Sequence, residues 1–154
     1  MSYELRRISD VDKGDFLRCG LKSPFGTSHI GFGRYIVENI TENVKMAYIG
    51  GQGILTEEGE EWSDMAEYCA LLWEKKSYLI EFYSRSETVE KKKNYDVFRI
   101  IYKIKCIHSQ QYDKELREEL IKKLKECFIA YNTKRYKSSI CEKVSFMDTE
   151  VRWG

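Results

Sequence analysis

The sequence predicts a single α+β domain over residues 1–154, built from an antiparallel β-meander of about five strands and a C-terminal amphipathic helix packed on one face of the sheet. Three consecutive apolar segments precede one strongly amphipathic segment, which is the order expected for a meander covered by a helix. A chain of 154 residues with 42% hydrophobic side chains can also bury a core without disulfides or metal ions. No linker, internal repeat or low-complexity segment divides it.

The first half of the chain carries the weaker patterns. Residues 2–9 predict a strand, residues 10–21 a short helix or turn, and residues 44–55 a further strand that enters the meander. The tail, residues 140–154, can supply one or two closing strands.

The meander itself is clearer. The segments "YCALLWE" (68–74) and "SYLIEFYSR" (77–85) predict a hairpin around the short polar turn "EKKS". The polar segment 86–94 then predicts a link into a long strand, "NYDVFRIIYKIKCIHS". In that strand, strict alternation places one set of apolar side chains on one face: Phe98, Ile100, Tyr102, Ile104 and Cys106.

The amphipathic helix is predicted over residues 113–131. Apolar side chains recur there at steps of three and four and share one face, namely Leu116, Leu120, Leu124, Cys127, Phe128 and Tyr131. Asp113 is a suitable N-cap, and acidic residues precede the lysines, as the helix dipole favours.

Charge and cysteine usage restrict the class of protein. The net charge of +1 opposes a protein that binds nucleic acid mainly through a large positive field. Five scattered cysteines without a CxxC pair predict buried thiols in a reducing compartment, with no metal site and no disulfide framework. No segment approaches the roughly 18 consecutive apolar residues of a membrane helix, and the start of the chain lacks the apolar region of a signal peptide, so we expect a cytoplasmic protein that does not enter membranes.

Motifs for catalysis are incomplete. The glycines in "GFGR" (31–34) and "GGQGI" (50–54) match neither GxGxxG nor the P-loop and predict turns or bulges, and no cofactor is expected. A nuclease of the paired-histidine type would have to bring His29 and His108 together. Tyrosines and basic residues in the meander, such as Lys103 and Lys105, also allow contact with single-stranded nucleic acid.

One local stretch, "TEEGEEWSDMAEY" (56–68), stands out because it has six carboxylates and no Lys or Arg. Carboxylates around an aromatic residue suit the capture of a basic protein surface, since opposite potentials speed encounter and a desolvated ring adds binding energy. An exposed charged loop with its Trp side chain in the core is the alternative. The candidate partner-binding residues are Glu57, Glu58, Glu60, Glu61, Trp62, Asp64 and Glu67.

Two resemblances add to these patterns. The segment "ELRRISDVDKGDFLRCG" (4–20) resembles the opening of GNAT acetyltransferases, although no Q/R-x-x-G-x-G/A loop for coenzyme A precedes a helix here. The segments "YCALLWEKKSYLIEFYSRSE" and "YDKELREELIKKLKECFIAYN" resemble small cytoplasmic immunity proteins of bacterial polymorphic or contact-dependent toxin systems. That resemblance implies a non-enzymatic inhibitor that binds a cognate toxin, often a basic nuclease, and covers its active site or substrate surface.

The main hypothesis is therefore a cytoplasmic inhibitor of a toxin or effector protein. The alternatives are a small enzyme, either GNAT-like or a nuclease, a nucleic-acid-binding domain, and a structural subunit of a larger assembly.

Overall fold

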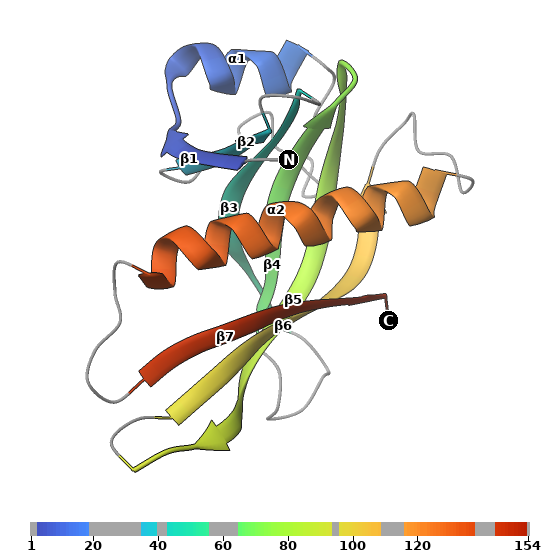
Figure 1. Cartoon of the computed structure of the whole chain (residues 1–154). Coiled ribbons are helices and arrows are strands. Elements are labelled where there is room, and N and C mark those ends of the chain that lie inside the picture. The colour runs from blue at the N-terminus through green and yellow to red at the C-terminus, as the bar shows by residue number, and fades with distance from the viewer. Residues whose placement is uncertain are drawn as a thin grey trace.

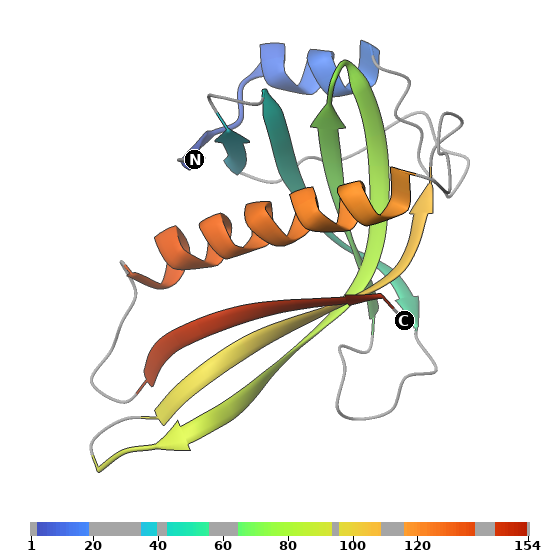
Figure 2. The same cartoon turned by 45° about the vertical axis from the view of Figure 1, so that its right-hand side comes forward.

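The computed structural model describes residues 3–18, 35–39, 43–55, 65–93, 96–108, 116–137 and 144–153, which form seven strands and two helices. In chain order the elements are β1 (Tyr3–Arg7), α1 (Asp10–Arg18), β2 (Tyr35–Asn39), β3 (Val44–Leu55), β4 (Met65–Trp73), β5 (Lys76–Lys91), β6 (Asp96–His108), α2 (Arg117–Lys137) and β7 (Val144–Trp153). The strands pair in sequence order in one curled sheet, and α2 lies across one of its faces (Figure 1). Figure 2 shows α1 at the far end of the sheet from the turn that joins β5 to β6.

The α+β class is confirmed, but the predicted sheet of about five antiparallel strands is only partly right. The described residues add a short strand, β2, which pairs between β1 and β3. In addition, β7 pairs with β6 in parallel. The parallel pairing follows from α2, because a helical crossover returns the chain to the end of the sheet where the preceding strand began.

The turn between β4 and β5 is shorter than predicted, and strand β5 is longer than predicted. Glu74 and Lys75 join β4 to β5 with φ values of 51° and 62°, the pair of left-handed residues that a type I′ hairpin turn requires. At its other end β5 continues to Lys91, so most of the predicted link 86–94 is strand. Its pairing with β6 places Glu87 opposite Arg99, and the two side chains form an ion pair at 3.7 Å.

A β-bulge interrupts the alternation of β6. Ile104 pairs with Phe82 and Cys106 pairs with Glu81, which leaves Lys105 as the extra residue. Before the bulge, the alternating set Phe98, Ile100, Tyr102 and Ile104 packs with α2, whereas Cys106 lies beside Glu81 on the opposite face. The prediction that Cys106 shares the face of Ile104 is therefore wrong, since one inserted residue reverses the phase of a strand.

The main core lies between the sheet and α2. The predicted apolar face of α2 is confirmed: Leu120, Leu124, Cys127 and Phe128 are fully buried, and Leu116 and Tyr131 pack at its margin. The helix runs from Arg117 to Lys137, so it begins and ends later than predicted, and Asp113 lies outside the described residues. Because α2 contacts both β1 and β7, it connects the two edges of the curled sheet.

A smaller core lies on the opposite face, where Phe16 of α1 packs with Tyr68, Leu79 and Tyr83. Charged side chains fix this helix to the sheet. Arg6 of β1 makes two hydrogen bonds to the buried carboxylate of Asp12, at 2.8 and 2.7 Å.

The same carboxylate completes the N-terminus of α1. Asp12 accepts hydrogen bonds from the backbone N–H and the hydroxyl of Ser9, while the Asp12 N–H donates to the Ser9 hydroxyl. This reciprocal arrangement is a capping box, with aspartate in the position usually held by Glu or Gln. These hydrogen bonds, above all those from Arg6, hold the pKa of Asp12 well below its usual range.

We predict that Phe128→Ala lowers the free energy of unfolding by about 3–5 kcal/mol, because a fully buried ring is removed from a close-packed site. The Phe128 ring lies 4.0 Å from the Tyr102 ring and 5.3 Å from the Phe82 ring, centroid to centroid. Chemical denaturation measures the change. The exposed neighbour Ile129 is the matched control, and an equal loss in Ile129→Ala would contradict this role of the core.

We predict that Asp12→Asn lowers the free energy of unfolding by about 1–3 kcal/mol at neutral pH, because Arg6 and Ser9 lose their charged partner. The depressed pKa makes this contribution complete above the pKa of the unfolded chain, roughly 3.9, and lost as the pH falls through the folded-state value.

Denaturant unfolding of both proteins from pH 7 to pH 2 should therefore show stability curves that converge in acid. Asp10→Asn, on the exposed side of the same helical turn, is the control and should follow the wild-type curve. A constant offset between wild type and Asp12→Asn across the whole pH range would contradict the linkage.

Candidate functional site

The predicted partner-binding residues fall mostly outside the part of the chain that the structure describes. The partner-binding candidates outside the described residues are Glu57, Glu58, Glu60, Glu61, Trp62 and Asp64. His29 of the nuclease hypothesis and the cysteines Cys19 and Cys141 also lie outside them. Glu67 is described, on β4, and it lies in the wall of a cleft.

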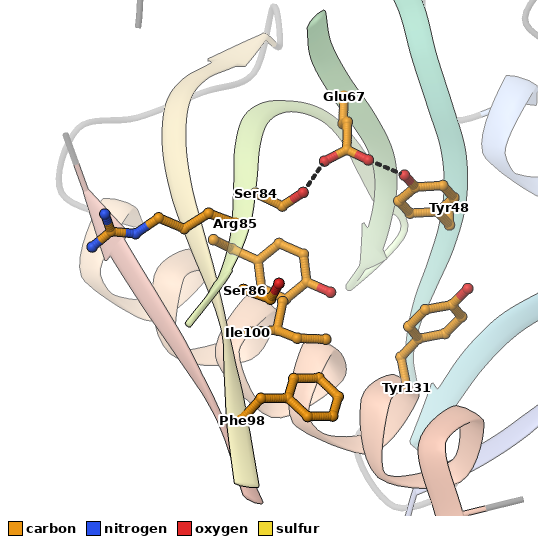
Figure 3. Close-up of a pocket in the computed structure, with 9 residues that line it drawn as sticks. Tyr48, Glu67, Ser84, Arg85, Ser86, Phe98, Ile100 and Tyr131 are labelled. Carbon is orange, nitrogen blue, oxygen red and sulfur yellow. Dashed lines mark hydrogen bonds between the residues drawn. The ribbon is translucent and has the colours of Figure 1, made fainter. Parts of the chain in front are cut away.

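The cleft has a volume of about 330 Å³ and opens between the sheet and α2. Its hydroxyl-bearing and charged wall comes from three neighbouring strands and consists of Tyr48, Glu67, Ser84, Arg85 and Ser86. The remaining wall consists of Phe98, Ile100 and Tyr102 from β6 and Tyr131 from α2. Figure 3 shows Glu67 at one end of this arrangement and Phe98 at the other, with Tyr48 and Tyr131 along one side.

The alternation of β4 explains why Glu67 faces the cleft. Tyr68 and Ala70 belong to the core beneath α1, so Glu67, Cys69 and Leu71 face α2. Cys69 and Leu71 are covered by α2, whereas Glu67 lies further toward the start of the strand and is only half-buried. A carboxylate is tolerated at this position because it keeps access to the open cleft.

Two neutral hydroxyl groups hold the carboxylate in place. Tyr48 donates to Oε1 of Glu67 and Ser84 donates to Oε2 (Figure 3). Burial and the Glu67 carboxylate both raise the pKa of Tyr48, so its phenol stays protonated and acts as a donor. The two bonds therefore orient Glu67 without neutralising its charge.

Arg85 is the cation in the cleft wall, but it is directed elsewhere. Its Nη2 atom lies 3.8 Å from Oε2 of Glu87 on the same strand. Figure 3 shows the Arg85 side chain extending away from Glu67. The carboxylate and the guanidinium thus occupy separate parts of the wall.

The aromatic side of the cleft is held by α2. The rings of Tyr48 and Tyr131 lie nearly parallel, 6.1 Å apart between centroids. Next to Tyr131, the fully buried Asn132 accepts a hydrogen bond from the Tyr102 hydroxyl at 3.1 Å and donates to the Thr149 hydroxyl at 2.9 Å. This chain of bonds ties α2 to β6 and β7 and fixes the position of Tyr102.

A second polar group surrounds Glu81 on the opposite face of the sheet. Tyr68 donates to Oε1 of Glu81 at 2.6 Å, and Lys105 and His108 lie 3.9 and 3.6 Å from its oxygens. The bulge at Lys105 brings His108 to this face, although simple alternation places it in phase with Ile104.

This second group includes a thiol, since Cys106 Sγ lies 3.9 Å from Nδ1 of His108. A cysteine nucleophile needs a lowered pKa, whereas burial raises the pKa of Cys106. The Glu81 group therefore has the contacts of a structural polar cluster. His29 lies outside the described residues, and the paired-histidine hypothesis stays a prediction.

The remaining described cysteines agree with the sequence prediction of buried thiols. Cys69 and Cys127 are both fully buried and not bonded to sulfur. Burial raises the pKa of the Cys127 thiol to about 12 and moves that of Cys69 in the same direction, so both stay protonated and unreactive.

Residues 3–18, 35–39, 43–55, 65–93, 96–108, 116–137 and 144–153 contain no group of three or more His, Cys, Asp or Glu side chains placed to hold a metal ion. Neither α1 nor α2 has the length and apolar composition that a membrane-spanning helix needs.

Comparison with known proteins identifies no relative: no family model, no curated protein and no solved structure matches this chain. The function must therefore be argued from the cleft itself.

Sequence reasoning found the carboxylate of this cleft but missed its surroundings. Tyr48, Ser84 and Tyr131 are far apart in the chain, and each has an ordinary place in the periodicity of its own element. The apolar phase of α2 does include Tyr131, which marks it as core-facing. Only the pairing of β3, β4 and β5 brings the hydroxyls of Tyr48 and Ser84 to one carboxylate.

We predict that Asn132→Ala lowers the free energy of unfolding by about 1–3 kcal/mol, because the buried hydroxyls of Tyr102 and Thr149 both lose a partner. Thr133→Ala changes the exposed neighbour and should have little effect. Thermal or urea unfolding of the two variants tests this, and equal stabilities would show that the bonds through Asn132 contribute nothing.

Proposed function

We propose that this protein acts by binding, as a cytoplasmic inhibitor of the immunity-protein type that neutralises a toxin domain by covering its active site or substrate surface. A basic nuclease domain is the kind of partner that suits it. The observation that carries the proposal is the state of Glu67: a carboxylate at the mouth of a cleft whose hydrogen-bond partners are neutral hydroxyls.

Charge makes a basic partner the best match. Glu67 continues an acidic stretch that has no Lys or Arg between residues 56 and 68, while the chain as a whole is nearly neutral. A local negative potential accelerates encounter with a positively charged surface and disfavours acidic partners such as nucleic acid. The hydroxyl bonds also fix the direction of the Glu67 carboxylate before a partner arrives, which lowers the entropy cost of binding.

The Glu81 group supports catalysis less well than the Glu67 cleft supports binding. Its carboxylate is already bonded to Tyr68 and faces Lys105 and His108, and its thiol has a raised pKa. The side chains of the Glu81 group are not among the residues that line the cleft at Glu67. The proposal therefore rests on recognition at the Glu67 cleft.

The proposal predicts binding to the polypeptide encoded immediately beside this gene, measured by isothermal titration at two salt concentrations. Binding should weaken as salt rises, because opposite charges meet at the interface. Glu67→Lys should lower the affinity by about tenfold or more, since it places a cation where a cation is expected to bind.

Two further variants sharpen the titration. A triple change of Glu60, Glu61 and Asp64 to Lys tests the acidic stretch, and Glu4→Lys on the exposed side of β1 is the matched control for charge alone. Absence of heat with the neighbouring polypeptide would contradict the inhibitor proposal. Equal weakening by Glu4→Lys and Glu67→Lys would show that net charge matters and the cleft does not.

A further inference from the structure

The cleft at Glu67 is polar at one end and apolar at the other. Figure 3 shows the Glu67 carboxylate with Ser84 and Tyr48 at one end, and Ile100 and Phe98 toward the other. A ligand that fills it must therefore combine a polar or charged head with an apolar stem. Its volume of about 330 Å³ lies at the low end of the range for small-ligand sites, which suits a single side chain or a small molecule.

The head of the ligand should be a cation. Each oxygen of Glu67 accepts one hydrogen bond from a neutral hydroxyl, and a carboxylate has about four acceptor positions in all. The Glu67 carboxylate therefore keeps acceptor positions beyond those that the two hydroxyls use. Arg85 is paired with Glu87 and points away from Glu67 (Figure 3).

The cation should be an ammonium group. A guanidinium binds best through two parallel bonds and needs a vacant acceptor position on each carboxylate oxygen in one plane, which is a stricter requirement where each oxygen already accepts a hydroxyl bond. An ammonium group is a compact point charge that can satisfy the remaining acceptor positions one at a time. The half-buried ring of Tyr131, parallel to that of Tyr48, adds the aromatic surface that attracts such a cation.

We infer that the cleft binds a primary ammonium group on an unbranched aliphatic chain, and that a lysine side chain of the protein partner supplies it. The apolar stem of lysine packs along Ile100 and Phe98, and its charged end reaches Glu67. The identity of the donor as a partner lysine rests on the proposed function. The ammonium chemistry of the cleft rests on its own geometry, so the two can be tested separately.

The experiment uses the isolated protein labelled with ¹⁵N and follows its amide resonances by NMR at constant ionic strength. The probes are n-butylammonium, n-butanol, n-butyrate and Nα-acetyl-lysine methylamide. We expect saturable shifts at Glu67, Ser84 and Tyr131 with butylammonium and with the lysine derivative, and no saturation with butanol or butyrate.

Variants assign the binding to the cleft. Glu67→Gln keeps the shape and an acceptor oxygen but removes the charge, and should weaken butylammonium binding by about tenfold or more. Glu90→Gln, exposed further along β5, is the matched control and should bind as wild type. Tyr131→Leu keeps an apolar contact but removes the ring, and should weaken binding of the ammonium probes as well.

Several outcomes overturn the inference. Saturable binding of butyrate at the cleft would show that Arg85 directs the site toward anions, and equal binding of butanol would show that charge is not recognised. Unchanged binding in Glu67→Gln would place the ammonium group elsewhere. Binding of butylammonium but not of the lysine derivative would reject a partner lysine and assign the site to a free amine.

The two proposals fail in different ways. If the neighbouring polypeptide does not bind but butylammonium does, the inhibitor function is wrong and the ammonium site stands. If the polypeptide binds with equal affinity to wild type and Glu67→Gln while butylammonium does not saturate, the inhibitor function stands and the lysine site is wrong.

Discussion

The packing of α2 across the concave face of the curled sheet is the constraint on which the rest of the structure depends. Four fully buried side chains of α2 meet apolar side chains from β2 to β6, and the helix contacts both edge strands. The helix begins after β6 and delivers the chain to β7, so it also decides that these two strands are parallel. The cleft lies beside Tyr131, at the margin of this packed stripe, where the helix no longer fills the concave face.

Strand phase decides which chemistry lies on which face. Along β4 the concave side receives Glu67 and the opposite side receives Tyr68, which bonds to Glu81. In β6 the bulge at Lys105 reverses the phase and moves Cys106 and His108 toward Glu81. Glu67 and Glu81 therefore have different surroundings: Glu81 faces basic side chains, and Glu67 faces hydroxyls and an open cleft.

The elements that could be predicted are those whose pattern is local. The apolar stripe of α2 repeats through Leu120, Leu124 and Phe128, and the hairpin of β4 and β5 shows two apolar segments around a short polar turn. By contrast, β2 is only five residues long, and the bulge at Lys105 leaves no mark in the alternation of β6. At the candidate site, composition drew attention to Glu67. The hydroxyls that hold it come from residues 48 and 84, and no local pattern links residues that meet only through strand pairing.

The neutral donors at Glu67 orient the carboxylate without cancelling its charge, whereas an ion pair would do both. A lysine or arginine of the same chain would orient the carboxylate but also cancel its charge, leaving little attraction for a ligand. Hydroxyl groups orient it and leave the charge in place, in a cleft where partial burial makes each electrostatic contact stronger than in water. The cost is a half-buried charge in the isolated protein, which its access to the cleft keeps small. The two donors also favour a carboxylate over an amide at this position, because Tyr48 and Ser84 donate to separate oxygens and Gln has a single acceptor oxygen.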